Sequence, residues 1–204
     1  MPSLSISLII IIFTCLVSIS AFSNQDQLYK LSLQPYMVKR YNQFYRFFTS
    51  GFVHADYGHL IFNMLTLYFF GSFVEQVFIY LFNSKALYIA YYILGIIVAN
   101  LPSYFKHRNN PDYVSLGASG AISAIVFTSI LVQPWATISV FFALPLPAVV
   151  YGALFLIISA YLSRKGGGNI NHDAHLWGAL FGLIFPLIFQ PELGTEFLFK
   201  LTHR

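Results

Sequence analysis

Residues 86–105 read ALYIAYYILGIIVANLPSYF, a stretch without a single charged side chain. About 20 apolar residues in a helix cross the roughly 30 Å hydrocarbon core of a lipid bilayer. A run of this length and composition therefore predicts a transmembrane helix. The polar segment that follows it, KHRNNPD at residues 106–112, predicts that this helix ends at a membrane surface.

Other apolar runs flank this stretch on both sides. No Lys or Arg precedes the first of them, as the n-region of a cleaved signal peptide would require, so we expect a retained first span. We find no internal repeat and predict one membrane domain over residues 1–204. The chain is thus predicted to be an all-α integral membrane protein with six transmembrane helices, both termini on one side, and further spans at residues 4–22, 58–82, 114–133, 147–162 and 173–189.

The segments between the predicted spans differ in character. Residues 23–57 mix Lys30, Lys39, Arg40 and Arg46 with many aromatic residues, which predicts a long interfacial first loop with short amphipathic helices. Residues 137–146 are predicted to be a partly embedded loop, because proline suits the first turn of the helix that follows. Three glycines at residues 166–168 predict a flexible turn.

The composition of the chain agrees with a membrane protein. Of 204 residues, 57% are hydrophobic and 9% are charged, against roughly 25% charged residues in a soluble domain. The net charge is +4, but the basic residues are scattered between apolar runs and form no stripe for nucleic acid. We therefore predict a lipid bilayer as the surroundings and no nucleic-acid partner. Cys15 is the only cysteine, which excludes an internal disulfide and a multi-cysteine metal site.

A few polar residues lie inside the apolar runs, where an ionisable side chain costs roughly 2–3 kcal/mol. His59 and Asn63 are four residues apart and so share one helix face. His175 shares its stripe with Gly178 and Gly182, and small residues at such spacing let helices approach closely in lipid. The segment Gly117-Ala-Ser-Gly-Ala also has only small side chains, so Ser119 is predicted to lie where another helix comes near.

These polar groups make up an acyl-transfer site in outline. A serine hydroxyl is a weak nucleophile unless a base takes its proton, and His175 is the candidate base for Ser119. His59 and Asn63 carry N–H donors of the kind that stabilise the oxyanion of a tetrahedral intermediate. No carboxylate is clearly placed to orient the base, which favours a Ser/His dyad. Asp173 is a weaker third candidate, only two residues from His175.

With these residues in this order, the chain resembles the rhomboid family of intramembrane serine proteases. The first-loop pair Tyr45-Arg46 is similar to the Trp-Arg pair of the family, and Gly71-x3-Glu75 is similar to its Gly-x3-Glu. Three spaced blocks carry much more weight together than one Gly-x-Ser-Gly alone. They occur in the order of the family: His54-x4-His59-x3-Asn63, Gly117-Ala118-Ser119-Gly120 and Ala174-His175-x2-Gly178.

The resemblance, which covers residues 45–182, implies a rhomboid-like bundle that cleaves transmembrane segments of other proteins. It implies Ser119 as nucleophile and His175 as general base, with His59, Asn63 and the Ser119 N–H in the oxyanion hole. It implies no metal and no cofactor. It also implies movement of the fifth helix or of the loop that caps the site, which is expected at residues 166–168. It also implies the plasma membrane of a bacterium, with the active site facing outward. Expected structural support comes from Arg46, His54, Glu75, Gly117, Gly120, Gly178 and Gly182, with Glu75 capping or pairing and His54 serving the loop.

Three alternatives stay open. The histidines at positions 54, 59, 172 and 175 invite a zinc site, although the His-Glu-x2-His helix of membrane zinc proteases is absent from the sequence. A catalytically inactive rhomboid-like escort protein would lack the serine or the histidine, and both are present. A small transporter would suit polar residues at mid-membrane, but no inverted repeat is visible. Nothing in the sequence indicates an oligomeric state.

The distribution of basic residues opposes the implied orientation. Under it, eight cations lie outside and three inside, whereas cytoplasmic loops normally carry the excess. We follow the resemblance, because an embedded first loop need not count as a short translocated loop. The predicted outer cations are Lys30, Lys39, Arg40, Arg46, Lys106, Arg108, Arg164 and Lys165, and the inner ones are Lys85, Lys200 and Arg204.

Overall fold

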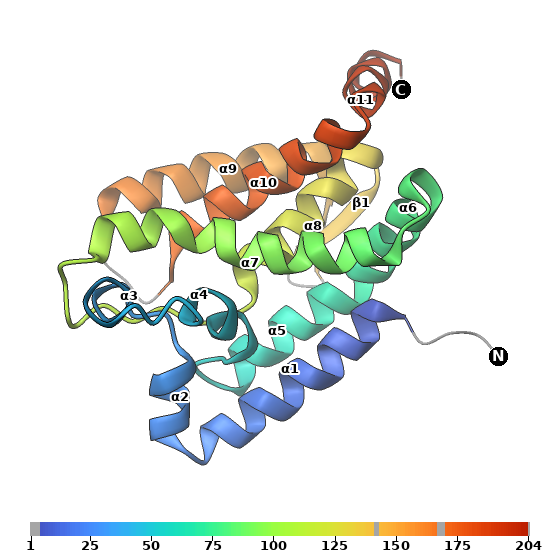
Figure 1. Ribbon diagram of the computed structural model, residues 1–204. Coiled ribbons are helices and arrows are strands. Elements are labelled where there is room, and N and C mark those ends of the chain that lie inside the picture. Colours follow the sequence, from blue (N-terminus) through green and yellow to red (C-terminus); the bar gives the residue numbers. More distant parts are fainter. Residues whose placement is uncertain (1–4, 141–142, 167–169, 204) are drawn as a thin grey trace.

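A computed structural model of the chain describes residues 5–140, 143–166 and 170–203, and it is a bundle of helices (Figure 1). The helices are apolar along most of their length, which confirms the predicted all-α membrane class. In the described chain, four segments are long and apolar enough to cross a bilayer: Tyr57–Phe82, Lys85–His107, Ala148–Lys165 and His172–Phe189. Two shorter apolar helices complete the bundle: Ile6–Phe22 and Ser119–Val132.

The observed boundaries differ from the predicted ones mainly at one helix. The span predicted from about residue 114 begins only at Ser119, because Gly117 has a φ of +117° and breaks the helical path. Residue 4, the predicted start of the first span, lies outside the described residues. The bundle helices are α1 (Ile6–Phe22), α5 (Tyr57–Thr66), the π-helical turn η2 (Leu67–Gly71), α6 (Ser72–Phe82), α7 (Lys85–His107), α8 (Ser119–Val132), α9 (Ala148–Lys165) and α10 (His172–Phe189).

Helix α8 lies at the centre of the bundle, between α7 and α10 (Figure 1). Every one of its residues from Gly120 to Leu131 is buried, so it presents no lipid-facing side in this stretch. The hydroxyls of Tyr91 on α7 and Thr128 on α8 are hydrogen-bonded at 2.7 Å, and the Thr128 hydroxyl donates to the carbonyl of Gly182 on α10. These bonds satisfy buried polar groups and tie the three helices together.

A buried carboxylate fixes α1 to α6. Glu75 accepts hydrogen bonds from the hydroxyls of Ser5 and Ser7 and from the backbone N–H groups of Ile6 and Ser7, at 2.7–3.0 Å. The first N–H groups of a helix have no partner within the helix, and the positive end of the helix dipole favours an anion there. Glu75 therefore caps α1 from a neighbouring helix.

The first loop folds into the short helices α2 (Gln25–Leu31), α3 (Pro35–Tyr41) and α4 (Arg46–Thr49), followed by a 3-10 turn, η1 (Ser50–Phe52). Arg46 is 2% exposed. Its guanidinium donates to the carbonyls of Tyr29 and Ser32, both at 2.8 Å, and to the side chain of Gln43. A buried arginine of this kind holds α2 and α4 together through its fork of donors.

Two features near the C-terminal half were not predicted. The loop predicted at residues 137–146 contains an antiparallel hairpin of β1 (Thr137–Val140) and β2 (Leu144–Pro147). A further helix, α11 (Glu192–Thr202), follows the last span. Lys200 of α11 donates to the carbonyl of Val132, and the Trp135 indole donates to the carbonyl of Lys200, so α11 is docked where α8 ends.

Candidate active site

Helix α8 is too short to cross a bilayer by itself. With 14 residues, α8 is about 21 Å long, about 9 Å short of the hydrocarbon core. The loop that leads to Ser119 packs against the first loop, where the N–H of Gly117 donates to the carbonyl of Ser50. Non-helical backbone within a membrane is tolerated only where protein or a water-filled cavity surrounds it.

Such a cavity is present at the start of α8. It encloses about 1120 Å³ and opens among α5, α8, α10 and the hairpin. Apolar side chains form most of its wall, as in a typical ligand site, and polar side chains also line it. The polar lining residues include His59, Asn63, Ser119, Ser123, Asn171 and His175.

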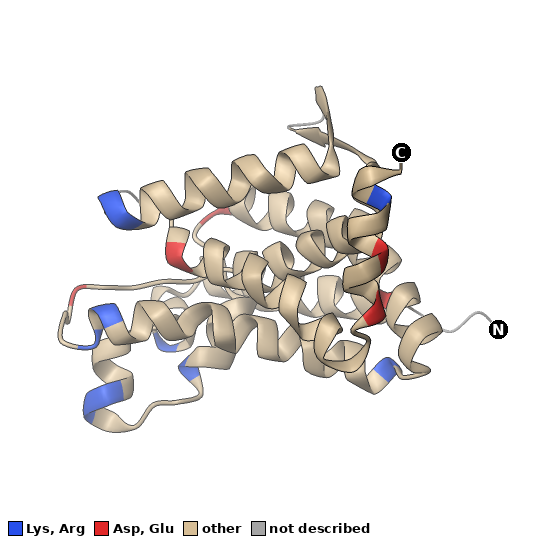
Figure 2. Cartoon of the chain, turned by 90° about the horizontal axis from the view of Figure 1, so that it is seen from above, with Lys and Arg blue, Asp and Glu red and all other residues tan. Residues whose placement is uncertain are grey.

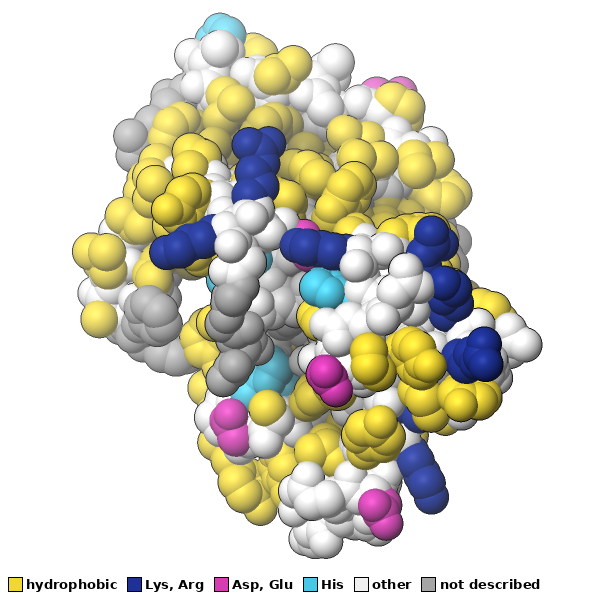
Figure 3. Space-filling view, turned by 90° about the vertical axis from the view of Figure 1, so that its left-hand side faces the viewer, with side chains coloured by type: hydrophobic (Ala, Val, Ile, Leu, Met, Phe, Trp, Pro, Cys, Tyr) yellow, Lys and Arg dark blue, Asp and Glu magenta, His cyan; other side chains and the backbone are white. Residues whose placement is uncertain are grey.

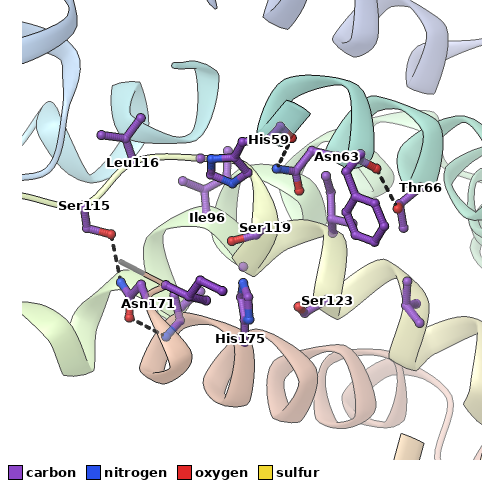
Figure 4. A pocket seen from close by; sticks show the side chains of 18 of the residues that line it. His59, Asn63, Thr66, Ile96, Ser115, Leu116, Ser119, Ser123, Asn171 and His175 are labelled. Atoms are coloured by element: carbon purple, nitrogen blue, oxygen red, sulfur yellow. Dashed lines mark hydrogen bonds between the residues drawn. The ribbon is translucent and has the colours of Figure 1, made fainter. Parts of the chain in front are cut away.

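Backbone contact between α8 and α10 brings Ser119 and His175 into this one cavity. A Cβ added at Gly178 would overlap the carbonyl of Gly120, and one added at Gly182 would overlap the carbonyl of Ala124. Only glycine permits this approach. In Figure 4 the imidazole of His175 rises from α10 toward Ser119. No hydrogen bond joins the two side chains in the described part of the chain. Hydrogen bonds between catalytic residues are often long without substrate, so Ser119 and His175 stay a candidate pair.

Helix α5 supplies two side chains on the other side of Ser119 (Figure 4). Asp56 caps this helix by accepting the N–H of His59 at 2.8 Å, which sets where His59 and Asn63 face. The Asn63 amide donates one N–H to the carbonyl of His59 at 3.0 Å and keeps a second donor. The ring of His59 lies against Gly117, where an added Cβ would be 2.6 Å from the ring.

His54 holds the turn that leads into α8. Its Nε2 accepts the N–H of Ala118 at 3.4 Å, and its Nδ1 lies 3.0 Å from the Ser18 hydroxyl. Because that hydroxyl donates to the carbonyl of Phe52, His54 must carry its proton on Nδ1. Burial, with a smaller contribution from His59, lowers the pKa of His54 from 6.5 to about 3, so the ring is neutral.

Asn171 was missed by the sequence analysis, although an Asn just before an apolar run is a helix-start signal. Its side-chain oxygen accepts the N–H of Ala174 and the hydroxyl of Ser103, both at 3.0 Å. Its amide donates to the Ser115 hydroxyl at 2.9 Å. One side chain thus joins the start of α10 to α7 and to the loop before Ser119.

Asp173, the candidate third member of the site, has bonding partners other than His175. The carboxylate of Asp173 accepts hydrogen bonds from Lys106, at 3.1 Å, and from the Ser163 hydroxyl. Among the described residues, no group of three or more His, Cys, Asp or Glu side chains is arranged to hold a metal ion. The cap expected at residues 166–168 falls mostly outside the described residues.

Comparison with known proteins gives one consistent result. The Rhomboid domain family model matches residues 41–192, which include every helix around the cavity. The chain belongs to the rhomboid family. Its α1, which Glu75 caps, precedes the matched segment, and α11 begins at the end of it.

Several relatives support the family assignment. The chain is 36% identical over 143 residues to the mitochondrial RHOMBOID-like protein 12 of Arabidopsis thaliana, covering 64% of this chain and 42% of that protein. It is 32% identical over 157 residues to the chloroplastic Rhomboid-like protein 11 of the same plant, covering 73% and 54%. The human mitochondrial presenilin-associated rhomboid-like protein is 30% identical over 155 residues, covering 74% and 38%. The chain thus spans about half the length of these relatives.

Proposed function

We propose that this rhomboid family member is an intramembrane serine endopeptidase that cleaves transmembrane segments of other membrane proteins. One observation carries the proposal: Ser119 and His175 line the same cavity from two helices whose backbones touch. A hydroxyl and an imidazole held on rigid, closely packed helices have the preorganisation that acyl transfer requires. Integral membrane helices and family membership fit substrates that are themselves in the bilayer.

In the proposed mechanism, Ser119 Oγ attacks the carbonyl carbon of the scissile peptide bond. His175 takes the hydroxyl proton and then passes it to the leaving nitrogen, which frees the amine fragment and leaves an acyl ester on Ser119. A water molecule, with its proton taken by His175, hydrolyses that ester and restores the hydroxyl. The two residues act as a dyad, since the Asp173 carboxylate is already bound to Lys106 and Ser163.

The negative charge that develops on the carbonyl oxygen needs donors aimed at it. Candidates are the second N–H of Asn63, a ring N–H of His59 and the backbone N–H of Ser119. Helix α8 has no side-chain cap, and its first residues, Ser119 and Gly120, line the cavity. The unpaired N–H groups and the positive dipole end at the start of a helix favour a negative charge there.

The size and character of the cavity fit an unwound apolar peptide. A regular helix keeps its carbonyls hydrogen-bonded and shielded, so the segment to be cut has to unwind before attack. The hollow of about 1120 Å³ has room for several extended residues, and Phe69, Val126 and Phe155 give it apolar walls. We therefore propose single transmembrane segments with helix-weakening residues as the substrate class.

Labelling with a fluorophosphonate serine-hydrolase probe in detergent tests the chemistry. Wild type should react, and Ser119→Ala and His175→Gln should not. Ser123→Ala is the matched control, because Ser123 lines the same cavity one turn further along α8 and should leave labelling intact. The assignment would be overturned, and an escort role favoured, if folded wild-type protein did not react with the probe. Loss of labelling in Ser123→Ala and not in Ser119→Ala would overturn it as well.

Sidedness and membrane are proposed separately. The resemblance implies a bacterial plasma membrane with the cavity facing outward, whereas the cations at the cavity end predict the opposite orientation. The relatives reported above are named as mitochondrial and chloroplastic proteins. The variant Asn109→Cys, in a Cys15→Ser background, has one cysteine. It should react with a membrane-impermeant maleimide in intact cells if the cavity faces outward. Reaction only after the membrane is opened would reverse the orientation.

A further inference from the structure

Cations gather at the cavity end of the bundle (Figures 2 and 3). One of the basic residues at this end, Lys106, forms an ion pair with Asp173. At the opposite end of the bundle, Lys200 forms an ion pair with Glu196. Several cations at one membrane surface form no ion pair within the described residues: Lys30, Lys39, Arg40, Arg108, Arg164 and Lys165.

Three of these cations meet in a small hollow away from the catalytic cavity, which we call the basic pocket. It is formed where the last turn of α3 approaches the end of α7, encloses about 260 Å³ and is lined by Tyr36, Lys39, Arg40, Arg108 and Asn109. Lys39 donates to the side chain of Asn109 at 2.6 Å, which holds the two walls together. Like charges that line one hollow repel one another, and an anion bound between them would reduce that repulsion.

Apolar surface leads from the basic pocket into the membrane. Leu94, Leu101 and Phe105 lie on one face of α7, spaced seven and four residues apart, and all three are exposed. The Arg108 guanidinium lies 5.8 Å from the centre of the Phe105 ring, at the end of this stripe. Exposed aromatic side chains beside the pocket, including Tyr41 and Phe44, are typical of the membrane interface.

We propose that the basic pocket binds the phosphate of an anionic phospholipid, with one acyl chain lying along the Leu94, Leu101 and Phe105 stripe of α7. Arginine binds phosphate through a planar fork of donors, and basic pockets at helix ends bind anionic headgroups. A zwitterionic lipid carries the same phosphate, but its ammonium group would be repelled by three cations. The pocket should therefore prefer phosphatidylglycerol to phosphatidylcholine.

The bound lipid would also brace the chain that leads to Ser119. The segment from Arg108 to Ala118 contacts the first loop again where Leu33 and Ser115 exchange backbone hydrogen bonds at 2.8 and 3.0 Å. A phosphate shared by Arg40 and Arg108 adds a link between the same two segments. This site is separate from the proposed protease chemistry and does not depend on it.

Native mass spectrometry of the full chain, released from an uncharged detergent with defined amounts of each lipid, tests the proposal. Wild type should bind phosphatidylglycerol more tightly than phosphatidylcholine. In Arg40→Gln/Arg108→Gln this preference should fall roughly fivefold for each cation removed. The double variant Arg164→Gln/Lys165→Gln is the matched control, since it removes two exposed cations from the same membrane surface and should keep the preference.

Two further arms separate the outcomes. Arg40→Lys/Arg108→Lys retains the charge and should retain most of the preference, which distinguishes loss of the site from loss of the fold. Phosphatidylglycerol should raise the thermal unfolding midpoint of wild type, and inorganic phosphate at the same concentration should not. Equal protection by inorganic phosphate would overturn the lipid assignment, as would an equal loss of preference in the Arg164/Lys165 control.

Discussion

Gly178→Ala is the sharpest test of how α10 positions its histidine. The added methyl group would overlap the Gly120 carbonyl oxygen and lie 2.8 Å from the carbonyl carbon, where 3.4 Å marks an ordinary contact. Since the opposing atoms are backbone, α10 has to move away from α8 by about 0.6 Å or more. His175 is one helical turn from this position and moves with it.

The expected cost to catalysis is larger than the cost to stability. A misplacement of about 1 Å can slow an enzyme about 100-fold, so we expect a loss of roughly 10- to 100-fold in kcat/KM. Overpacking costs about 1–3 kcal/mol, and the better helix propensity of alanine returns up to about 1 kcal/mol of that. The variant should therefore remain folded while it loses activity.

The assay compares cleavage of a model transmembrane substrate with thermal unfolding in the same detergent. Gly194→Ala on α11 is the control, because its nearest foreign atom would be 3.5 Å away, an ordinary contact. Unchanged cleavage in Gly178→Ala, with an unfolding midpoint like that of wild type, would show that the glycine contact does not set the Ser119–His175 geometry.

Other substitutions probe the remaining parts of the site and its support. Asn63→Ala should lower kcat by roughly 10- to 1000-fold if its free N–H serves the oxyanion, and unchanged turnover would leave it a packing residue. Glu75→Gln should destabilise the protein by about 1.5–3 kcal/mol in unfolding measurements, because the charge that caps α1 is lost. His54 is neutral when folded but titrates near 6.5 when unfolded, so stability should fall as pH drops from about 6.5 toward 3. His54→Gln should flatten that dependence. Cleavage should survive a chelator, and inhibition reversed by added zinc would revive a metal site.

Much of the fold could be predicted because lipid imposes a simple rule. Side chains facing the bilayer have to be apolar, so the helices Lys85–His107 and His172–Phe189 were predicted within two residues of their ends. Glycine spacing also predicted the close approach of α8 and α10, since few other residues allow backbones to touch.

The start of α8 was predicted five residues early for a physical reason. Residues 114–118 are apolar or small and continue the hydropathy pattern, yet they form an extended loop held by backbone bonds to the first loop. Hydropathy reports where a residue lies in the membrane and not which backbone shape it takes. The bond of His54 to Ala118 and the bonds of Asn171 to Ser103 and Ser115 join residues more than 50 positions apart, which no local pattern encodes.

The short length of α8 ties this protein to the thickness of the membrane around it. Its long neighbours match a normal bilayer, but Ser119 is anchored at a fixed distance from the far surface. A thicker bilayer would place Ser119 further beneath the headgroups and lengthen the path by which water reaches it, whereas a thinner one would bring it closer to the surface. For the proposed protease, we therefore expect the acyl-chain length of the lipid to change the rate of cleavage without any change in the amino-acid sequence.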